Sequence, residues 1–182
     1  VARAVTPLAE AALGKSIVLT NKTGGTGAIA TTYVRSRPSD GYTMLYGAEN
    51  PLMYKVLGLS DIDYDQYYAV NVLARGVAVV VVNADSPWKT FKDLIADVQK
   101  RPGQVKMGTT GIGGLPHTVG SMLKTVIKFD VTAVPFDGEG PGITALLGKH
   151  IEFIPVGIGA AAEHVKSGRV RALSVVNVEA VP

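Results

Sequence analysis

Apolar and polar positions follow two alternating patterns along the whole chain. Short apolar runs typical of buried strands give way to segments with helical spacing, and the pairing repeats to the end. The predicted strands cover residues 17–20, 42–46, 70–83 with a break at Gly76, 105–108, 131–135, 151–156 and 171–176. The predicted helices cover residues 1–13, 28–36, 52–57, 91–99, 118–128, 143–147 and 160–166. This alternation predicts an α/β protein with mostly parallel sheets covered by helices.

Punctuating residues refine this pattern. Thr90 precedes an apolar-periodic segment and is the residue type that caps a helix N-terminus. Gly76 interrupts an apolar run that is long for one strand. The best domain boundary lies near Arg75 and Gly76, because the region after it forms a complete alternating unit and the region before it resembles part of another.

Composition excludes several classes of protein. Hydrophobic residues make up 47% of the 182 residues and charged residues 18%, so sizeable cores are expected and disorder is not. The net charge of +3 is spread along the chain without a basic cluster, which argues against nucleic acid as a partner. No apolar run reaches the roughly 18 to 20 residues of a membrane span, so no direct membrane insertion is predicted. The absence of cysteine excludes disulfides and thiolate chemistry.

The most informative segment is a glycine-rich turn, Asn21-Lys-Thr-Gly-Gly-Thr-Gly-Ala-Ile-Ala30. It stands between a predicted strand and a predicted helix, where backbone N–H groups gather at the positive end of the helix dipole. Such a turn suits a carboxylate or a phosphate. The candidate ligand-binding residues here are Thr26, Gly27 and Ala28.

A second turn of the same kind is Met107-Gly-Thr-Thr-Gly-Ile-Gly-Gly-Leu-Pro-His117. Thr109 and Thr110 add hydroxyl groups, and Gly111 and Gly113 allow a ligand close to the backbone. His117 falls in the first turn of the next helix, where it could reach the ligand, cap locally or pack. Two such turns suggest two lobes that hold one anionic molecule.

A third loop follows a strand at the same predicted sheet edge and contains Phe136 and Asp137. Ligands of open α/β sheets bind at the carboxyl ends of the strands, which makes both residues candidates for the site. Neither a catalytic constellation nor a metal-ligand spacing is present. The sequence therefore predicts no catalytic residues, no metal and no cofactor.

Two other interpretations of the first turn stay open. The glycines can simply form a tight connection between strand and helix. Alternatively, Gly25, Gly27 and Ala30 fit the G-x-G-x-x-A spacing of a dinucleotide-binding turn, with Glu49 about 20 residues further on. That spacing would indicate a Rossmann-type nucleotide-dependent enzyme.

Several motifs, in order, resemble those of the tripartite tricarboxylate transporter substrate-binding proteins, often called the Bug family. The first turn resembles the family's Asn-Arg-Pro-Gly-Ala-Gly-Gly-Asn-Ile-Ala signature. Further similar segments are Pro38-Ser-Asp-Gly-Tyr-Thr-Met-Leu45, Asn50-Pro51, the loop from Gly111 to His117, Val134-Pro-Phe-Asp-Gly138 and Ser167-Gly-Arg-Val-Arg-Ala-Leu173.

The resemblance implies a periplasmic-binding-protein-like fold, a Venus flytrap of two α/β lobes. On that template residues 1–75 form lobe one, 76–173 form lobe two, and 174–182 return to lobe one, with hinges near Arg75-Gly76 and Ser174. The implied function is capture of a small carboxylate in the periplasm, without catalysis, for membrane permease subunits of the transporter.

The chain also departs from the family pattern. The family's first strand and the C-terminal part of lobe one are expected beyond these residues, so the chain resembles a protein truncated at both ends. Thr23 and Thr26 replace a usual Pro and Gly. Asp137 stands where Lys or Arg is common, and an acid there favours a ligand with an amino group, such as an acidic amino acid.

Overall fold

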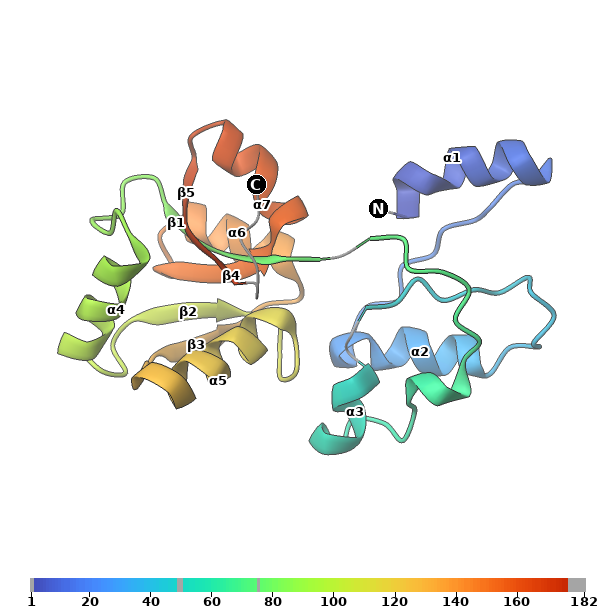
Figure 1. Cartoon of the computed structure of the whole chain (residues 1–182), viewed down its shortest axis with the longest axis horizontal. Coiled ribbons are helices and arrows are strands. Elements are labelled where there is room, and N and C mark those ends of the chain that lie inside the picture. Colours follow the sequence, from blue (N-terminus) through green and yellow to red (C-terminus); the bar gives the residue numbers. More distant parts are fainter. Residues whose placement is uncertain (1, 49–50, 75, 177–182) are drawn as a thin grey trace. The chain divides into compact units, whose positions relative to one another are not determined.

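The structure of the protein is a computed structural model that describes residues 2–48, 51–74 and 76–176. The chain divides into two compact units, Val1–Arg75 and Gly76–Pro182. The first unit is helical in its described residues, and the second is a sheet covered by helices (Figure 1).

The first unit contains the helices α1 (Ala2–Leu13), α2 (Ala28–Arg35) and α3 (Pro51–Leu57), with short 3-10 turns at Gly25–Gly27 and Tyr64–Gln66. These helices lie close to the predicted ranges. Gly14 follows α1 with φ 61° and donates its N–H to the carbonyl of Glu10, a C-cap in the left-handed conformation that glycine adopts readily.

The strands predicted at 17–20 and 42–46 are wrong, because within the described residues these segments pair with no other strand. A strand is defined by a ladder to a partner, and an apolar run specifies only an extended backbone. Here the backbone amides find local side-chain acceptors: Ile17 N–H donates to Glu10 Oε1 at 2.6 Å and Tyr42 N–H to Asp40 Oδ1 at 3.0 Å.

The second unit is built on a five-stranded sheet with the order β3-β2-β4-β1-β5. Its strands are β1 (Ala78–Asn83), β2 (Lys106–Thr109), β3 (Thr132–Pro135), β4 (Phe153–Gly157) and β5 (Val170–Val176). β2 runs parallel to β3 and β4, whereas β1 runs antiparallel to β4 and β5. The first residue of β1, Ala78, pairs with Val176 at the end of β5.

This sheet is mixed, so the expected parallel order applies only to β2, β3 and β4. The correction has a simple cause. The central strand β1 is buried on both faces, with Val80, Val81 and Val82 at 0% exposure. Such a strand is apolar throughout in either direction, and its composition carries no signal for parallel or antiparallel pairing.

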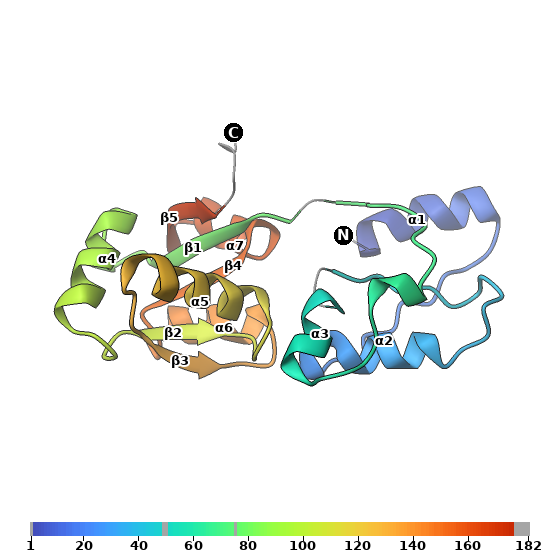
Figure 2. The ribbon, with the colours of Figure 1, turned by 60° about the horizontal axis from the view of Figure 1, so that its bottom comes forward.

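Two hydrophobic clusters lie on the two faces of the sheet. Helices α4 (Phe91–Lys100) and α5 (Leu115–Ile127) cover Val80 and Val82, and helices α6 (Glu139–Leu147) and α7 (Ile158–Lys166) cover Val79 and Val81. Figure 2 shows α5 and α6 with the strands between them. Alternate residues of β1 thus pack into the clusters on opposite faces of the sheet, because successive side chains of a strand point to opposite faces.

The direction of the strands decides where each helix begins. β2, β3 and β4 end at one edge of the sheet, and α5, α6 and α7 follow them there. β1 ends at the opposite edge, where Thr90 starts α4 with a capping box to Asp93, as its sequence predicts. The carboxyl edge of the three parallel strands therefore collects three loop-to-helix connections.

Candidate functional site

The first glycine-rich turn lies within the first unit and bends sharply into α2. Thr26 has φ 53°, and Gly25 and Gly27 have φ 54° and 92°. The N–H of Gly27 donates to the carbonyl of Gly24 at 3.0 Å, and that of Ala28 donates to Gly25. Two of the amides expected to face an anion therefore bond within the turn.

The hydroxyl of a buried tyrosine supports this turn by hydrogen bonding. The Tyr54 hydroxyl, on α3, donates to the carbonyl of Thr26 at 3.1 Å and lies 3.3 Å from Thr31 Oγ1. Thr31 Oγ1 donates to the carbonyl of Gly27 at 2.8 Å. Tyr54 is 1% exposed, and a Cβ added at Gly27 would lie 3.0 Å from its hydroxyl oxygen.

Sequence reasoning missed Tyr54, since a tyrosine in a short amphipathic helix reads as an ordinary core residue. A second tyrosine supports the same helix: the Tyr67 hydroxyl donates to the carbonyl of Thr31 at 2.7 Å. Partial burial raises the pKa of Tyr67 above its usual value, which already lies well above neutral pH.

An open pocket of about 490 Å³ lies beside the first turn, between Gly25, Ala28, Tyr33 and Leu59. Lys22 Nζ lies 4.0 Å from the ring centroid of Tyr33 and the Arg37 guanidinium carbon 4.2 Å from it. Both cations can interact with the ring's π electrons, so the pocket is bordered by positive charge.

The second turn follows β2 and leads into α5. Thr109 is buried and its carbonyl accepts the N–H of Phe136 at 2.7 Å. Gly111 and Gly113 have φ 90° and 82°, and Gly114 N–H donates to Gly111 at 3.3 Å. A Cβ at Gly114 would collide with the Thr110 hydroxyl, so this position requires a glycine for space.

His117 belongs to this turn. Its Nδ1 accepts the N–H of Gly113 at 3.2 Å. Of the alternatives open from sequence, the structure shows the local bond. The Gly113 amide is consequently engaged with His117, in contrast to the expectation that it faces an anion.

Phe136 and Asp137 lie on the neighbouring loop, between β3 and α6. The bond from Phe136 N–H to Thr109 places this loop beside the second turn. Phe136 is half-buried and packs against the cluster under α6 and α7, and Asp137 is exposed. The structure thus brings together the candidate residues of the second unit, namely Thr109, Thr110, Gly111, Gly113, His117, Phe136 and Asp137.

Glu139 is a further residue of this edge that sequence reasoning missed. Its Oε1 accepts the N–H of Gly157 at 2.9 Å, which ties the start of α6 to the start of α7. The only signal in the sequence is an acid in the first turn of a helix, a position that the dipole favours in any protein.

The three helices at this edge share one feature. Their N-cap residues are glycines without a side-chain capping bond: Gly114 for α5, Gly138 for α6 and Gly157 for α7. At the opposite edge α4 has its own Thr90 cap. A glycine cap places no side chain of its own over the positive end of the helix dipole. The Glu139 carboxylate already stands at the start of α6 and accepts the Gly157 N–H at the start of α7, whereas α5 has no acidic residue in its first turn.

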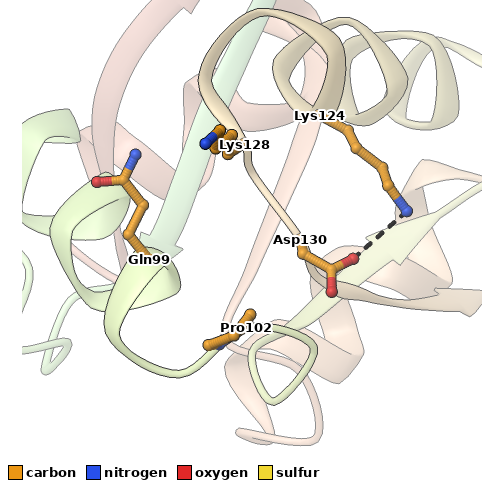
Figure 3. Close-up of a pocket in the computed structure, with 5 residues that line it drawn as sticks. All are labelled: Gln99, Pro102, Lys124, Lys128 and Asp130. Atoms are coloured by element: carbon orange, nitrogen blue, oxygen red, sulfur yellow. Dashed lines mark ion pairs between the residues drawn. The ribbon is translucent and has the colours of Figure 1, made fainter.

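An open pocket of the second unit lies elsewhere, at the C-terminal ends of α4 and α5 (Figure 3). It has a volume of about 580 Å³ and is lined by Gln99, Pro102, Lys124, Lys128 and Asp130. Lys124 Nζ is paired with Asp130 at 3.4 Å, and Gln99 Nε2 donates to the carbonyl of Ile127 at 3.0 Å. These pairings engage Lys124, Asp130 and Gln99. The pocket lies near the start of β3 and away from the carboxyl ends of β2, β3 and β4.

Two further observations limit the chemistry. Across residues 2–48, 51–74 and 76–176, no three His, Asp or Glu side chains gather in a metal-binding group. Within the same ranges no helix has the length and apolar character needed to traverse a bilayer.

Known proteins similar to this chain give its family. The tripartite tricarboxylate transporter family receptor, TctC, matches residues 1–180. A UPF0065 protein of Bordetella bronchiseptica is 28% identical over 177 residues, which is 96% of this chain and 52% of the relative.

Two solved structures are similar over the whole chain. Rpa4515 of R. palustris with adipate has a TM-score of 0.87 and 28% identity, covering 98% of this chain and 60% of that one. The periplasmic binding protein BugD has a TM-score of 0.81 and 28% identity, covering 100% and 61%. This chain spans about half the length of the curated relatives it matches.

The family and its solved members are solute-binding proteins, so the interpretation as a nucleotide-dependent enzyme is set aside. Glu49, on which that interpretation partly depended, lies outside the described residues. The α/β fold of the second unit, its glycine-capped helices and the match across residues 1–180 lead to one conclusion: the chain belongs to the receptor family of the tripartite tricarboxylate transporters.

Proposed function

We propose that this chain is part of a periplasmic receptor that captures a small carboxylate and delivers it to the membrane permease subunits of a tripartite tricarboxylate transporter. The observation that carries the proposal is the carboxyl edge of the second unit, where three neighbouring helices begin at N-cap glycines that make no side-chain capping bond. Their dipoles favour an anion at this edge. The relative solved with adipate supports a carboxylate as the ligand class.

In this proposal Thr109, Thr110 and Gly111 hold one carboxylate group of the ligand, and Gly113 and His117 shape the loop that presents them. Thr26, Gly27 and Ala28 are the proposed contacts of the first unit for an anionic group, and Ala28 also lines the pocket beside that turn. Phe136 supports the loop that carries Asp137. Hydrogen bonds to a charged acceptor contribute roughly 1.5–3 kcal/mol each, so a few of them suffice for tight binding.

The proposed lobes are residues 1–75 with 174–182, and residues 76–173. The division of the chain into compact units at Arg75 and Gly76 supports the first boundary. Ser174 pairs with Val80 and Val176 with Ala78, so residues 174–176 lie in the sheet of the second unit, and residues 177–182 lie outside the described residues. Arg75, one of the proposed hinge residues, also lies outside them.

Isothermal titration calorimetry on the chain tests the proposal with adipate, L-malate, citrate, L-aspartate and L-glutamate, and with NAD as the nucleotide control. We expect saturable binding of at least one carboxylate and none of NAD. Binding of NAD alone would contradict the receptor function. Absence of binding by all six compounds would overturn the proposal that this chain holds the ligand.

Asp137 sets the expected ligand preference. A carboxylate at this exposed position repels a second acidic group of the ligand and attracts an ammonium group. We therefore expect L-aspartate or L-glutamate to bind more tightly than citrate or succinate. Asp137→Asn should narrow the difference by about fivefold, because one exposed charge contributes on the order of 1 kcal/mol.

Asp85→Asn is the matched control for this change. Asp85 is equally a surface acid, but it lies in the connection after β1, at the opposite edge of the sheet. Its substitution should leave the preference unaltered. Tighter binding of citrate than of either amino acid by the unsubstituted chain would refute the preference and leave the receptor function standing.

A further inference from the structure

The bond between His117 and Gly113 fixes the protonation state of the imidazole. Nδ1 accepts the Gly113 N–H at 3.2 Å. An imidazole nitrogen accepts a hydrogen bond only when it carries no proton, so in this arrangement the ring is neutral and its proton is on Nε2. Gly113 is itself buried, with φ 82°, and therefore depends on an acceptor inside the protein for its amide.

We propose that His117 is a positioning residue whose neutral form holds the loop from Thr109 to Gly114 in its ligand-binding shape, and whose protonation releases that loop. The part of the inference that concerns the loop stands on the hydrogen bond alone. The part that concerns ligand affinity rests on the proposed function.

Protonation of His117 acts on the loop in two ways. A proton on Nδ1 faces the Gly113 N–H with a second donor, so the bond is lost and a buried amide is left without its acceptor. The imidazolium also stands in the first turn of α5, where the helix dipole disfavours positive charge. The two ends of the loop are held by Phe136 N–H to the Thr109 carbonyl at 2.7 Å and by Thr118 N–H to the Gly114 carbonyl at 3.0 Å. The bonds within the loop are longer: Gly114 N–H to Gly111 at 3.3 Å and Thr109 Oγ1 to Gly111 at 3.4 Å.

The elements packed against α5 contribute little opposing charge at this end. β4 carries no titratable residue, and Lys106 of β2 stands at the opposite end of its strand. Among the charged groups of α4 and α5, Asp93 bonds with Thr90, Asp97 pairs with Arg101 and Lys124 pairs with Asp130. Lys92 and Lys100 are the other charged residues of α4. At the carboxyl edge the acids are Asp137, which is exposed, and Glu139, which accepts the Gly157 amide.

Asparagine and glutamine separate the positioning role from a merely structural one. In His117→Asn the side-chain oxygen takes the place of Nδ1 and can accept the Gly113 N–H at every pH. In His117→Gln the amide reaches the place of Nε2 instead, and the acceptor at the Nδ1 position is lost. Neither the Asn nor the Gln side chain gains a proton as the pH is lowered.

Nuclear magnetic resonance of the ¹⁵N-labelled chain reads the bond directly. As the pH is lowered from about pH 8 to about pH 5.5, we expect the Gly113 amide resonance and the His117 ring resonances to shift together. In His117→Asn it should stay near its high-pH position, and in His117→Gln it should resemble the low-pH form throughout. A Gly113 resonance that does not shift with pH, or that shifts equally in His117→Asn, would overturn the inference.

Calorimetry with L-malate at the two ends of this pH range measures the effect on ligand affinity. We expect the affinity of the unsubstituted chain for L-malate to fall about five- to tenfold on acidification, because one hydrogen bond is lost. The affinity of His117→Asn should fall less, and the fall that remains measures the effect of the ligand's own protonation. An equal loss in both proteins contradicts the link to affinity. If L-malate binds at neither pH, the proposed function fails for this ligand, and the Gly113 resonance still decides the role of His117.

Discussion

At the scale of single residues, the first glycine turn depends on one buried hydroxyl. Tyr54 supports the carbonyl of Thr26, a non-glycine residue held in the left-handed region at φ 53°. A left-handed conformation costs a non-glycine residue of order 1 kcal/mol and persists only where its surroundings hold it. Tyr54, which is buried, therefore supports the turn through the carbonyl of Thr26.

Replacing Tyr54 by phenylalanine tests this support. The change removes the bonds to Thr26 and Thr31 and keeps the ring in its buried place, so we expect a loss of about 1–2 kcal/mol in local stability. Amide hydrogen exchange in residues 24–35 should become faster by about tenfold. Tyr42→Phe, at a tyrosine that is 93% exposed, serves as the control and should leave this exchange unchanged. Equal rates in both variants would contradict a supporting role.

At the scale of elements, α4 shows how a helix end is secured by side chains. Asp97 Oδ2 accepts the indole N–H of Trp88 at 3.0 Å and binds the Arg101 Nη2 at 2.6 Å. The hydrogen bond from Arg101, followed by its charge, lowers the pKa of Asp97 below the usual value. The carboxylate thus joins the loop before α4 to the last turn of the helix.

The stability contributed by Asp97 depends on pH with a definite sign. A carboxyl group whose pKa is lower in the folded state stabilises the protein above its unfolded pKa, and this contribution is lost as the pH falls through the folded value. We expect Asp97→Asn to lower the free energy of unfolding by about 1 kcal/mol near neutral pH, with the difference shrinking below about pH 4. Urea unfolding at several pH values measures it.

Asp85→Asn provides the comparison here too. Asp85 pairs with Lys149 across side chains that are 76% and 65% exposed, and such pairs contribute little. Its substitution should change stability by less than about 0.5 kcal/mol at any pH. A loss for Asp97→Asn that is constant from neutral to acidic pH would show that the charge is not responsible.

Individual helices and strands also show how much of this structure can be predicted from the sequence. Helix α4 and its Thr90 cap follow from local chemistry and are confirmed, since a cap and an apolar stripe are read within a few residues. The antiparallel direction of β1 is set by its partners β4 and β5, far away in the chain. The glycine turns were visible as candidate sites, whereas the supports of their shape, Tyr54 and Glu139, act across 28 and 18 residues and gave no local signal.

At the scale of the whole molecule, the two units differ in how well they bury their apolar side chains. In the described part of the first unit the buried apolar positions are Ala28, Tyr54 and Pro51. Val18, Tyr42, Val56 and Tyr68 are among its large side chains that are at least 80% exposed. The second unit has a continuous cluster on each face of its sheet.

Local stability should follow this difference. Hydrogen exchange measured by mass spectrometry should be fast throughout residues 2–48 and 51–74 and slow in β1 and β4, because protection requires a buried and cooperative core. Brief trypsin digestion should correspondingly cleave the first unit and leave the second largely intact. Slow exchange in peptides from 17–20 or 42–46, comparable with that of β1, would contradict the prediction.

The pairing of Ala78 with Val176 has a consequence for protein engineering. The described part of the second unit begins and ends on adjacent strands, so the two ends of a segment 76–176 would be neighbours. A domain with neighbouring ends can be excised, inserted into a surface loop of an unrelated host or circularly permuted with a short linker. We expect a cassette of residues 76–176 to express as a folded module, in which its three glycine-capped helices can be studied on their own.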